Sequence, residues 1–289
     1  MYLNINRRNY CVEEYGEGEV LLLLHGYMES KKAFSSIKDK LGLQYRVIAV
    51  DLPGHGDAGE VDTPFSFDEL AADMVMLLDY LKIEGRVHFA GHSMGGYVGQ
   101  AMAAFYPNTL KSLNLIHSAT WAASNEYKKL KEREKKFVLK GKASSIARIS
   151  IPESFAPNNR ERLRPIIDAM IDDSKIMSQT SLVHIIDAMK ERQSWFHLVN
   201  CYPIPVHIIA GKYDQVAPLN KLKEDLPNWR NSHMTVLENS GHHGFIEEPE
   251  VFLYQLNQFT TQIDAHWKER QKAKEGKKGM SNDSIKTDE

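Results

Sequence analysis

Ser93 lies in a glycine-rich hexapeptide that could present a nucleophile. Residues 91–96 read Gly-His-Ser-Met-Gly-Gly, follow an apolar run at 86–90 and precede an Ala-rich segment that ends at Tyr106-Pro107. The serine therefore stands where a strand is expected to turn into a helix. At such a strained turn, glycines two residues before and after the serine prevent Cβ collisions with the neighbouring strand and helix. Because chance alone produces this pattern in roughly one of ten chains of this size, its interpretation depends on partner residues.

Asp214 and His242 are candidate partners for this serine. A serine hydroxyl needs a base to take its proton, and that base needs a group that fixes its tautomer. Asp214 follows an apolar run at 206–210, and His242 follows another at 234–237. The ends of parallel strands lie on one edge of a sheet, so the three residues could converge there as nucleophile, orienting acid and general base. The adjacent His243 is a competing base.

The elements that must position these residues are short apolar runs separated by helical patterns. This alternation predicts an α/β fold with a mostly parallel, doubly wound sheet. The runs that predict strands lie at 20–24, 46–50, 87–90, 113–116, 206–210 and 234–237. The alternating segments 2–5 and 10–15 predict an antiparallel hairpin at the sheet edge.

Helical patterns fill the intervals between these runs. Ser66 followed by Glu69 predicts a capped helix that continues to Leu81, and residues 94–105, 219–226 and 249–261 also read as helices. Between residues 121 and 203 the strand signals vanish. We therefore expect an α/β core at 1–120 and 204–266, and an inserted helical cap, or lid, at 121–203. Residues 267–289 have almost no apolar side chains and are predicted to be a disordered tail.

Composition narrows the partners. The chain has 289 residues, 42% of them hydrophobic, and a formal net charge of −2, with no pool of basic residues. These values predict a small-molecule substrate and neither a nucleic acid nor a membrane partner. The start lacks an apolar secretory segment, which predicts a cytoplasmic protein. The oligomeric state stays open.

No cofactor and no metal are predicted. His55 and Asp57 offer two metal-ligating types close together, but no complete ligand set such as a His-Glu-x-x-His helix accompanies them. Cys11 and Cys201 are far apart in the sequence and indicate neither a disulfide framework nor a Cys-x-x-Cys metal site.

The order Ser, Asp, His on three loops after strands resembles the α/β-hydrolase superfamily from about residue 3 to residue 261. The resemblance implies an oxyanion hole made by the backbone N–H groups of Met94 and Tyr27, because His25-Gly26 matches the His-Gly pattern of the family. It favours His242 over His243 as the base, since the following apolar residues and acidic-Pro pair also match. A similar turn to that around His55 occurs in the family without metal.

The resemblance also restricts the reaction. A serine at the turn argues against epoxide hydrolases and haloalkane dehalogenases of this fold, which carry aspartate there. Met94 departs from the tryptophan of prolyl-aminopeptidase-like members, and Tyr97 departs from the arginine of lyases with anionic substrates. We therefore expect a serine carboxylic-ester hydrolase that forms an acyl-enzyme on Ser93. A mostly apolar pocket for short to medium acyl chains is expected from Tyr27, Met94, Trp121, Trp195, Phe196 and Val216.

Two other classes remain open at this point. The same triad could cleave a carbon–carbon, lactone or thioester bond, because the fold does not fix the substrate. Alternatively, the protein could be a receptor that has no catalytic activity and binds a small hydrophobic ligand in the pocket. Reaction of Ser93 with a fluorophosphonate probe, followed by a substrate panel, separates these classes.

Overall fold

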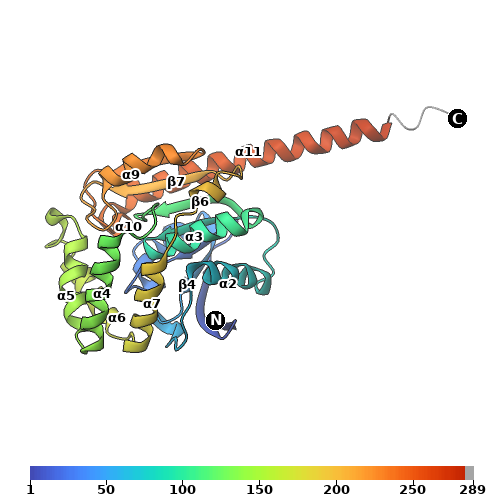
Figure 1. The fold of residues 1–289 in the computed structure, drawn as a ribbon. Coiled ribbons are helices and arrows are strands. Elements are labelled where there is room, and N and C mark those ends of the chain that lie inside the picture. Colours follow the sequence, from blue (N-terminus) through green and yellow to red (C-terminus); the bar gives the residue numbers. More distant parts are fainter. Residues whose placement is uncertain (284–289) are drawn as a thin grey trace.

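The computed structural model describes residues 1–283 and is built around one eight-stranded sheet (Figure 1). The strand order is β1-β2-β4-β3-β5-β6-β7-β8. Strands β1 and β2 pair antiparallel, and β2 pairs antiparallel with β4, whereas all other neighbours are parallel. The predicted mostly parallel sheet with an antiparallel hairpin at its edge is therefore confirmed. The strands are β1 (Tyr2–Ile5), β2 (Arg8–Tyr15), β3 (Glu19–Leu24), β4 (Tyr45–Asp51), β5 (Val87–His92), β6 (Leu110–Ile116), β7 (Val206–Gly211) and β8 (Ser232–Leu237).

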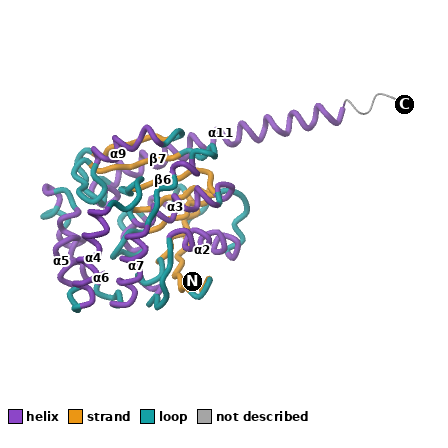
Figure 2. Tube along the Cα trace, in the orientation of Figure 1, coloured by secondary structure: helices purple, strands orange, loops and turns teal. Residues whose placement is uncertain are grey.

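Helices cover both faces of this sheet, as Figure 2 shows by the strands lying between helices. Alternate leucines of β3 divide between two hydrophobic clusters because successive strand residues point to opposite faces. Leu22 and Leu24 pack with α2 (Phe67–Tyr80) and α3 (Met94–Phe105). Leu21 and Leu23 pack in the cluster that includes α1 (Lys38–Gly42) and the start of α11 (Pro249–Asp283). The sheet is therefore doubly wound.

Helix α2 begins directly after Ser66, as the predicted capping residues indicate. The Ser66 side chain accepts the Glu69 N–H and the Glu69 carboxylate accepts the Ser66 N–H, so two N–H groups at the helix start are satisfied. Two further short helices lie near the carboxyl ends of β7 and β8, α9 (Leu219–Asp225) and α10 (Gly244–Glu247).

Only helices and turns occur between β6 and β7 in the described structure. They are α4 (Asn125–Leu139), α5 (Ala143–Ser154), α6 (Arg164–Ser174), α7 (Gln179–Glu191) and α8 (Phe196–Val199). Helices α4 to α7 lie together as a lobe beside the sheet (Figure 1). The lobe falls within the predicted cap segment, whose limits and action as a lid remain a prediction.

The last helix differs from what the sequence predicts. Instead of becoming disordered at residue 267, α11 continues to Asp283 and projects away from the sheet (Figure 1). Lys, Glu, Gln and Ala are strong helix formers, and extending a helix that the core already holds costs less than nucleating a new one. A lack of apolar residues therefore does not by itself exclude a helix. Residues 284–289 of the predicted tail lie outside the described residues. Along residues 1–283, no helix combines the length and hydropathy needed to cross a membrane.

Candidate active site

Ser93 occupies a strained turn between β5 and α3. Its φ of 48° and ψ of −111° are rare for a residue with a side chain. A Cβ on Gly91 would lie 2.5 Å from the backbone of Gly95, and one on Gly95 would lie 2.6 Å from the carbonyl oxygen of Leu24. Both glycines are thus required by the close approach of helix and strand. The turn places Ser93, which is 7% exposed, at the carboxyl edge of the sheet.

Asp214 and His242 meet at the same edge, after β7 and β8. The Nδ1 of His242 lies 2.8 Å from Oδ2 of Asp214. The other carboxylate oxygen of Asp214 accepts the N–H groups of Val216 and Ala217 at 2.8 and 2.9 Å, which fixes its orientation. This arrangement holds a proton on Nδ1 of His242 and leaves Nε2 as the basic atom.

The electrostatics of the pair suit a base. Burial raises the pKa of Asp214, but the charge and hydrogen bonds of His242 and His117 outweigh burial and hold that pKa well below its usual range. Burial lowers the pKa of His242, but the Asp214 carboxylate outweighs burial and raises it above the ordinary 6.5. No hydrogen bond joins Ser93 to His242 among the described residues. Such catalytic contacts are often long before substrate binds.

His117 is a third contact of Asp214 that sequence reasoning did not single out. Its Nε2 accepts the Gly244 N–H at 3.0 Å, so the ring proton lies on Nδ1, which is 3.3 Å from Oδ2 of Asp214. Burial lowers the pKa of His117 to about 4, which keeps the ring neutral. A histidine directly after a strand was the only sequence signal available for this contact.

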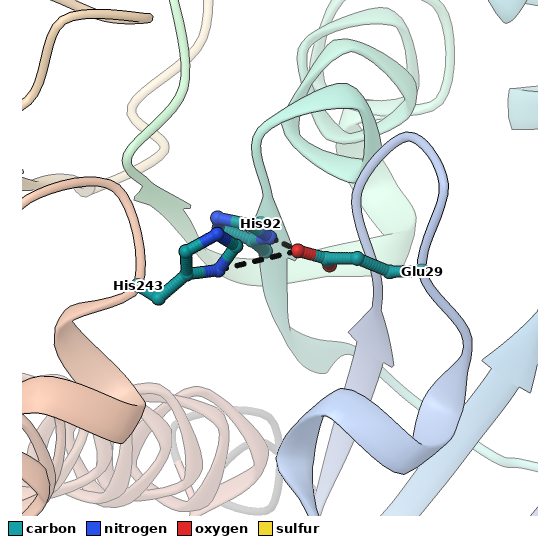
Figure 3. A group of neighbouring side chains, drawn as sticks. All are labelled: Glu29, His92 and His243. Atoms are coloured by element: carbon teal, nitrogen blue, oxygen red, sulfur yellow. Dashed lines mark hydrogen bonds and ion pairs between the residues drawn. The ribbon is translucent and has the colours of Figure 1, made fainter. Parts of the chain in front are cut away.

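His243 has a different environment from His242. Its Nε2 lies 2.9 Å from the Ser154 hydroxyl, and its ring stacks on Phe155 at a centroid distance of 4.4 Å. Burial lowers the pKa of His243 well below its ordinary value. The neutral ring thus packs against the end of α5. Its Nδ1 lies 3.3 Å from Glu29 (Figure 3), so His243 contacts a different carboxylate from the one that His242 contacts.

Glu29 and His92 complete this second cluster, which Figure 3 shows with both histidine rings directed at one carboxylate. The Nδ1 of His92 lies 2.8 Å from Oε2 of Glu29, and its Nε2 lies 2.8 Å from the carbonyl oxygen of His242. Both ring nitrogens of His92 therefore face oxygen atoms, which fixes the orientation of the ring. Burial raises the pKa of Glu29, but the charge and hydrogen bond of His92 outweigh burial and hold it well below the usual range.

The loop after β3 is tied to this cluster. Glu29 accepts the Gly26 N–H at 2.8 Å, and His25 bridges the Gly26 carbonyl and the Leu52 N–H at 2.8 and 3.0 Å. His25 thus holds the loop through both of its ring nitrogens. The N–H groups of Tyr27 and Met94, assigned above to the oxyanion hole, have no protein acceptor within the described part of the chain.

Glu247 fixes the loop that carries both histidines. Its carboxylate accepts the N–H groups of Gly241 and His243 at 2.8 and 3.2 Å, and that of Ala156 at 2.8 Å. The His242 N–H itself donates to the Ser154 carbonyl at 2.7 Å. The end of α5 is thereby anchored to the histidine loop, so the helical lobe positions the candidate base directly.

The residues predicted to line the pocket are dispersed. Trp195 packs on Phe105, the last residue of α3, about 18 Å along the helix from Ser93 at 1.5 Å per residue. Phe196 packs toward Trp229, and Val216 is 51% exposed. Trp121 lies under the Lys221 ammonium, 4.3 Å from the ring centroid. The structure therefore does not gather Trp195 and Phe196 around Ser93, because the returning chain crosses at the far end of α3.

The residues of the rejected metal motif do not share a ligand site. His55 contacts the Pro53 carbonyl at 3.1 Å, whereas Asp57 binds Lys31 at 2.8 Å. Among the described residues there are three groups whose potential ligand atoms lie within 4.8 Å of one another inside each group. They are Cys11, Asp51 and Asp57; Glu29, His92 and His243; and His117, Asp214 and His242. In the first, the Lys31 ammonium already occupies the position between the two carboxylates.

Comparisons with known proteins agree with this geometry. A family model described as the alpha/beta hydrolase fold matches residues 19–249. The chain belongs to the alpha/beta hydrolase family. The expected family and fold are thus confirmed.

Several relatives of this hydrolase are lipases or esterases. Monoacylglycerol lipase ABHD6 of Mus musculus is 26% identical over 258 residues, which cover 81% of this chain and 73% of the lipase. A thermophilic esterase from Thermogutta terrifontis has a TM-score of 0.82 at 22% identity over 91% of this chain and 98% of the esterase. An enol-lactonase from Burkholderia xenovorans has a TM-score of 0.83 at 21% identity over 90% of this chain and 100% of the lactonase. At these identities the two structures show the common fold only.

Proposed function

We propose that this hydrolase cleaves carboxylic esters of small to medium size through an acyl-enzyme on Ser93. The observation that carries the proposal is the Asp214–His242 pair, 2.8 Å apart, at the same sheet edge as a serine with φ of 48°. The lipase relatives support ester hydrolysis in general. The proposal assigns Ser93 as nucleophile, His242 as base and then acid, and Asp214 as the orienting group.

The reaction follows from the proton positions. With Nδ1 protonated and bound to Asp214, Nε2 of His242 takes the Ser93 proton as Oγ attacks the ester carbonyl. The free N–H groups of Tyr27 and Met94 point to an oxyanion hole that binds the developing charge. His242 then protonates the departing alcohol, and a water molecule, deprotonated by the same ring, releases the acid.

The test uses 4-nitrophenyl butyrate and a fluorophosphonate probe. We expect hydrolysis by the wild-type chain, its loss in Ser93→Ala, and labelling of the wild type alone. Ser240→Ala is a matched control, since Ser240 is also buried beside the histidine loop but binds Glu248. Unchanged turnover in Ser93→Ala would rule out the acyl-enzyme. Labelling without ester turnover would instead direct attention to lactones, thioesters and carbon–carbon bonds, and absence of labelling in folded protein would favour a ligand-binding role.

A further inference from the structure

Arg192 is a buried cation without a charged partner. It follows α7 and is 5% exposed, and its Nε and Nη1 have no hydrogen-bond partner. No carboxylate lies within ion-pair distance of Arg192 in the described residues, although arginine is almost never buried unpaired. A group from outside the chain would satisfy it.

The neighbouring acids are already occupied by other cations. Glu191 binds Lys128 at 3.5 Å, and Asp187 binds Lys135 at 2.6 Å. Within the helical lobe, Lys131 is also buried, but it binds Glu134 at 2.7 Å, which makes that pair neutral. The guanidinium of Arg192 is therefore the uncompensated charge of this region.

The surroundings of Arg192 lead toward Ser93. Its guanidinium carbon lies 4.7 Å from the ring centroid of Tyr97 and 4.2 Å from that of Tyr127. Tyr97 is four residues after Ser93, so both lie on one face of the α3 start, and the guanidinium lies on the order of 10 Å from the serine. Arg192 and Asp214 both influence the pKa of Tyr97, which burial raises to about 12. Tyr97 thus contacts the arginine from the same helix start that carries the candidate nucleophile.

Hydrogen bonds hold the segment around Arg192 in place, and Arg192 lines a cavity. Its carbonyl accepts the Ala123 N–H at 3.1 Å, where the chain enters the lobe, and the Ser194 hydroxyl donates to the Thr120 carbonyl at 2.7 Å. A cavity of about 230 Å³ between the start of α2 and α7 has Tyr97, Arg192 and Trp195 in its walls. Asp68, Asp187 and Glu191 also line this cavity, but Asp187 and Glu191 bind lysines, and Asp68 forms no ion pair with Arg192 in the described structure.

We infer that Arg192 binds a carboxylate carried by the substrate at a distance from the scissile ester. A planar guanidinium held between two aromatic rings matches a planar carboxylate in geometry, and one uncompensated charge matches a monoanion. This inference rests on the proposed ester hydrolysis and narrows its substrate class to anionic esters. The inference adds one positive charge, from the lobe, to the mostly apolar pocket that the sequence predicts.

The test compares esters that differ in one carboxylate. On the leaving-group side the pair is 4-acetoxybenzoate and its methyl ester, and on the acyl side it is mono(4-nitrophenyl) adipate and 4-nitrophenyl hexanoate. We expect the wild type to favour the charged member of at least one pair by about 10- to 100-fold in kcat/KM, as for one charge-assisted contact. Arg192→Met should lose this preference, and Arg192→Lys should keep part of it because the charge remains without the planar fork. Lys129→Met, which removes an exposed cation of α4 that forms no ion pair in the described structure, should keep the wild-type preference.

The outcomes separate the two proposals. Equal kcat/KM values within both pairs, unchanged in Arg192→Met, overturn the carboxylate site and leave ester hydrolysis standing. If no ester is cleaved, ester hydrolysis fails, and calorimetry with benzoate decides on Arg192. Tighter binding of benzoate than of benzyl alcohol by the wild type, lost in Arg192→Met or weakened in Arg192→Lys, supports the site. Equal binding of benzoate and benzyl alcohol by the wild type rejects it even if a variant fails to fold.

Discussion

Two clusters of the same composition border the Ser93 turn, and each combines one buried carboxylate with two imidazoles. Asp214 contacts His242 and His117, whereas Glu29 contacts His92 and His243. In the second cluster, ring nitrogens bind the His242 carbonyl and the Ser154 hydroxyl, so they connect loops. In the first, Nε2 of His242 has no bond to another residue in the described structure. Adjacent histidines with the same side chain thus differ in what their hydrogen bonds leave available for a substrate.

The largest expected effect separates the two adjacent histidines. His242→Ala should lower kcat by about 1,000-fold or more, because it removes the base, and general acid–base catalysis alone contributes about 10²–10⁴-fold. His243→Ala should retain most of kcat but lower the free energy of unfolding by about 3 kcal/mol, because it leaves a cavity beside Phe155. Ester hydrolysis and denaturant unfolding measure the two effects. Loss of turnover in His243→Ala, with activity kept in His242→Ala, would reassign the base.

The two carboxylates should differ in the same way. Asp214→Asn should reduce kcat by about 10²–10⁴-fold with little loss of fold, because an amide orients the wrong tautomer of His242. Glu29→Gln should mainly destabilise the protein, by about 3–5 kcal/mol, because it leaves a buried imidazole without its counter-charge. Urea unfolding and kcat, measured on both variants, show whether each substitution mainly lowers stability or mainly lowers turnover. A larger loss of kcat in Glu29→Gln than in Asp214→Asn would show that the clusters are not divided as described.

Low pH should reveal the contribution of Glu29 to the stability of the protein. The pKa of Glu29 is depressed in the fold, so its contribution to stability is present above the ordinary carboxyl pKa and is lost as pH falls below about 4.5 toward the folded value. We expect the free energy of unfolding to fall in that window for the wild type, and to fall less for Glu29→Gln. Parallel unfolding curves at pH 3.5 and pH 6 for the two proteins would contradict this assignment.

The parts of the site that local sterics dictate could be predicted from the sequence. Gly91 and Gly95 mark the Ser93 turn because a Cβ at either position would collide with the backbone, and short apolar runs mark the parallel strands that bring Asp214 and His242 to one edge. Contacts between residues far apart in the sequence could not be predicted. Glu29 in its loop reads as an ordinary surface acid, yet it meets His92 and His243, 63 and 214 positions further along the chain.

The lobe was predictable as helices but not in its packing. Helical periodicity between residues 121 and 203 carries no information on where the chain returns to the core. Trp195 and Phe196 were expected near the serine because they are aromatic, but the return crosses at Phe105, at the opposite end of α3 from Ser93. Arg192, three residues earlier, lies beside Tyr97 instead. The few residues between α7 and α8 thus contact different parts of α3, and helical periodicity alone does not indicate which of them does so.

The pH dependence of turnover should sharpen the role of Asp214. A base must be neutral to act, so kcat/KM should be lost as pH falls through the raised pKa of His242, at a value above 6.5. In the residual activity of Asp214→Asn, the charge of Asp214 no longer opposes the effect of burial on the pKa of His242, so the acid limb should move to lower pH. An acid limb at the same pH in both proteins would mean that another group controls the profile.

The smallest expected effect concerns His117, the second imidazole on Asp214. His117→Phe removes the Nδ1–H that shares the Asp214 charge, so more of that charge acts on His242, and the acid limb should move up by on the order of a few tenths of a pH unit. The matched control is His88→Phe, which removes another fully buried imidazole of the same sheet, one that contacts Ser112 of β6 and Asp264 of α11. Both variants should lose stability, but only the first should change the pH profile of kcat/KM. Identical profiles in the two variants would reduce His117 to a packing residue, and His242 and Asp214 would then form the whole of the proton-accepting unit.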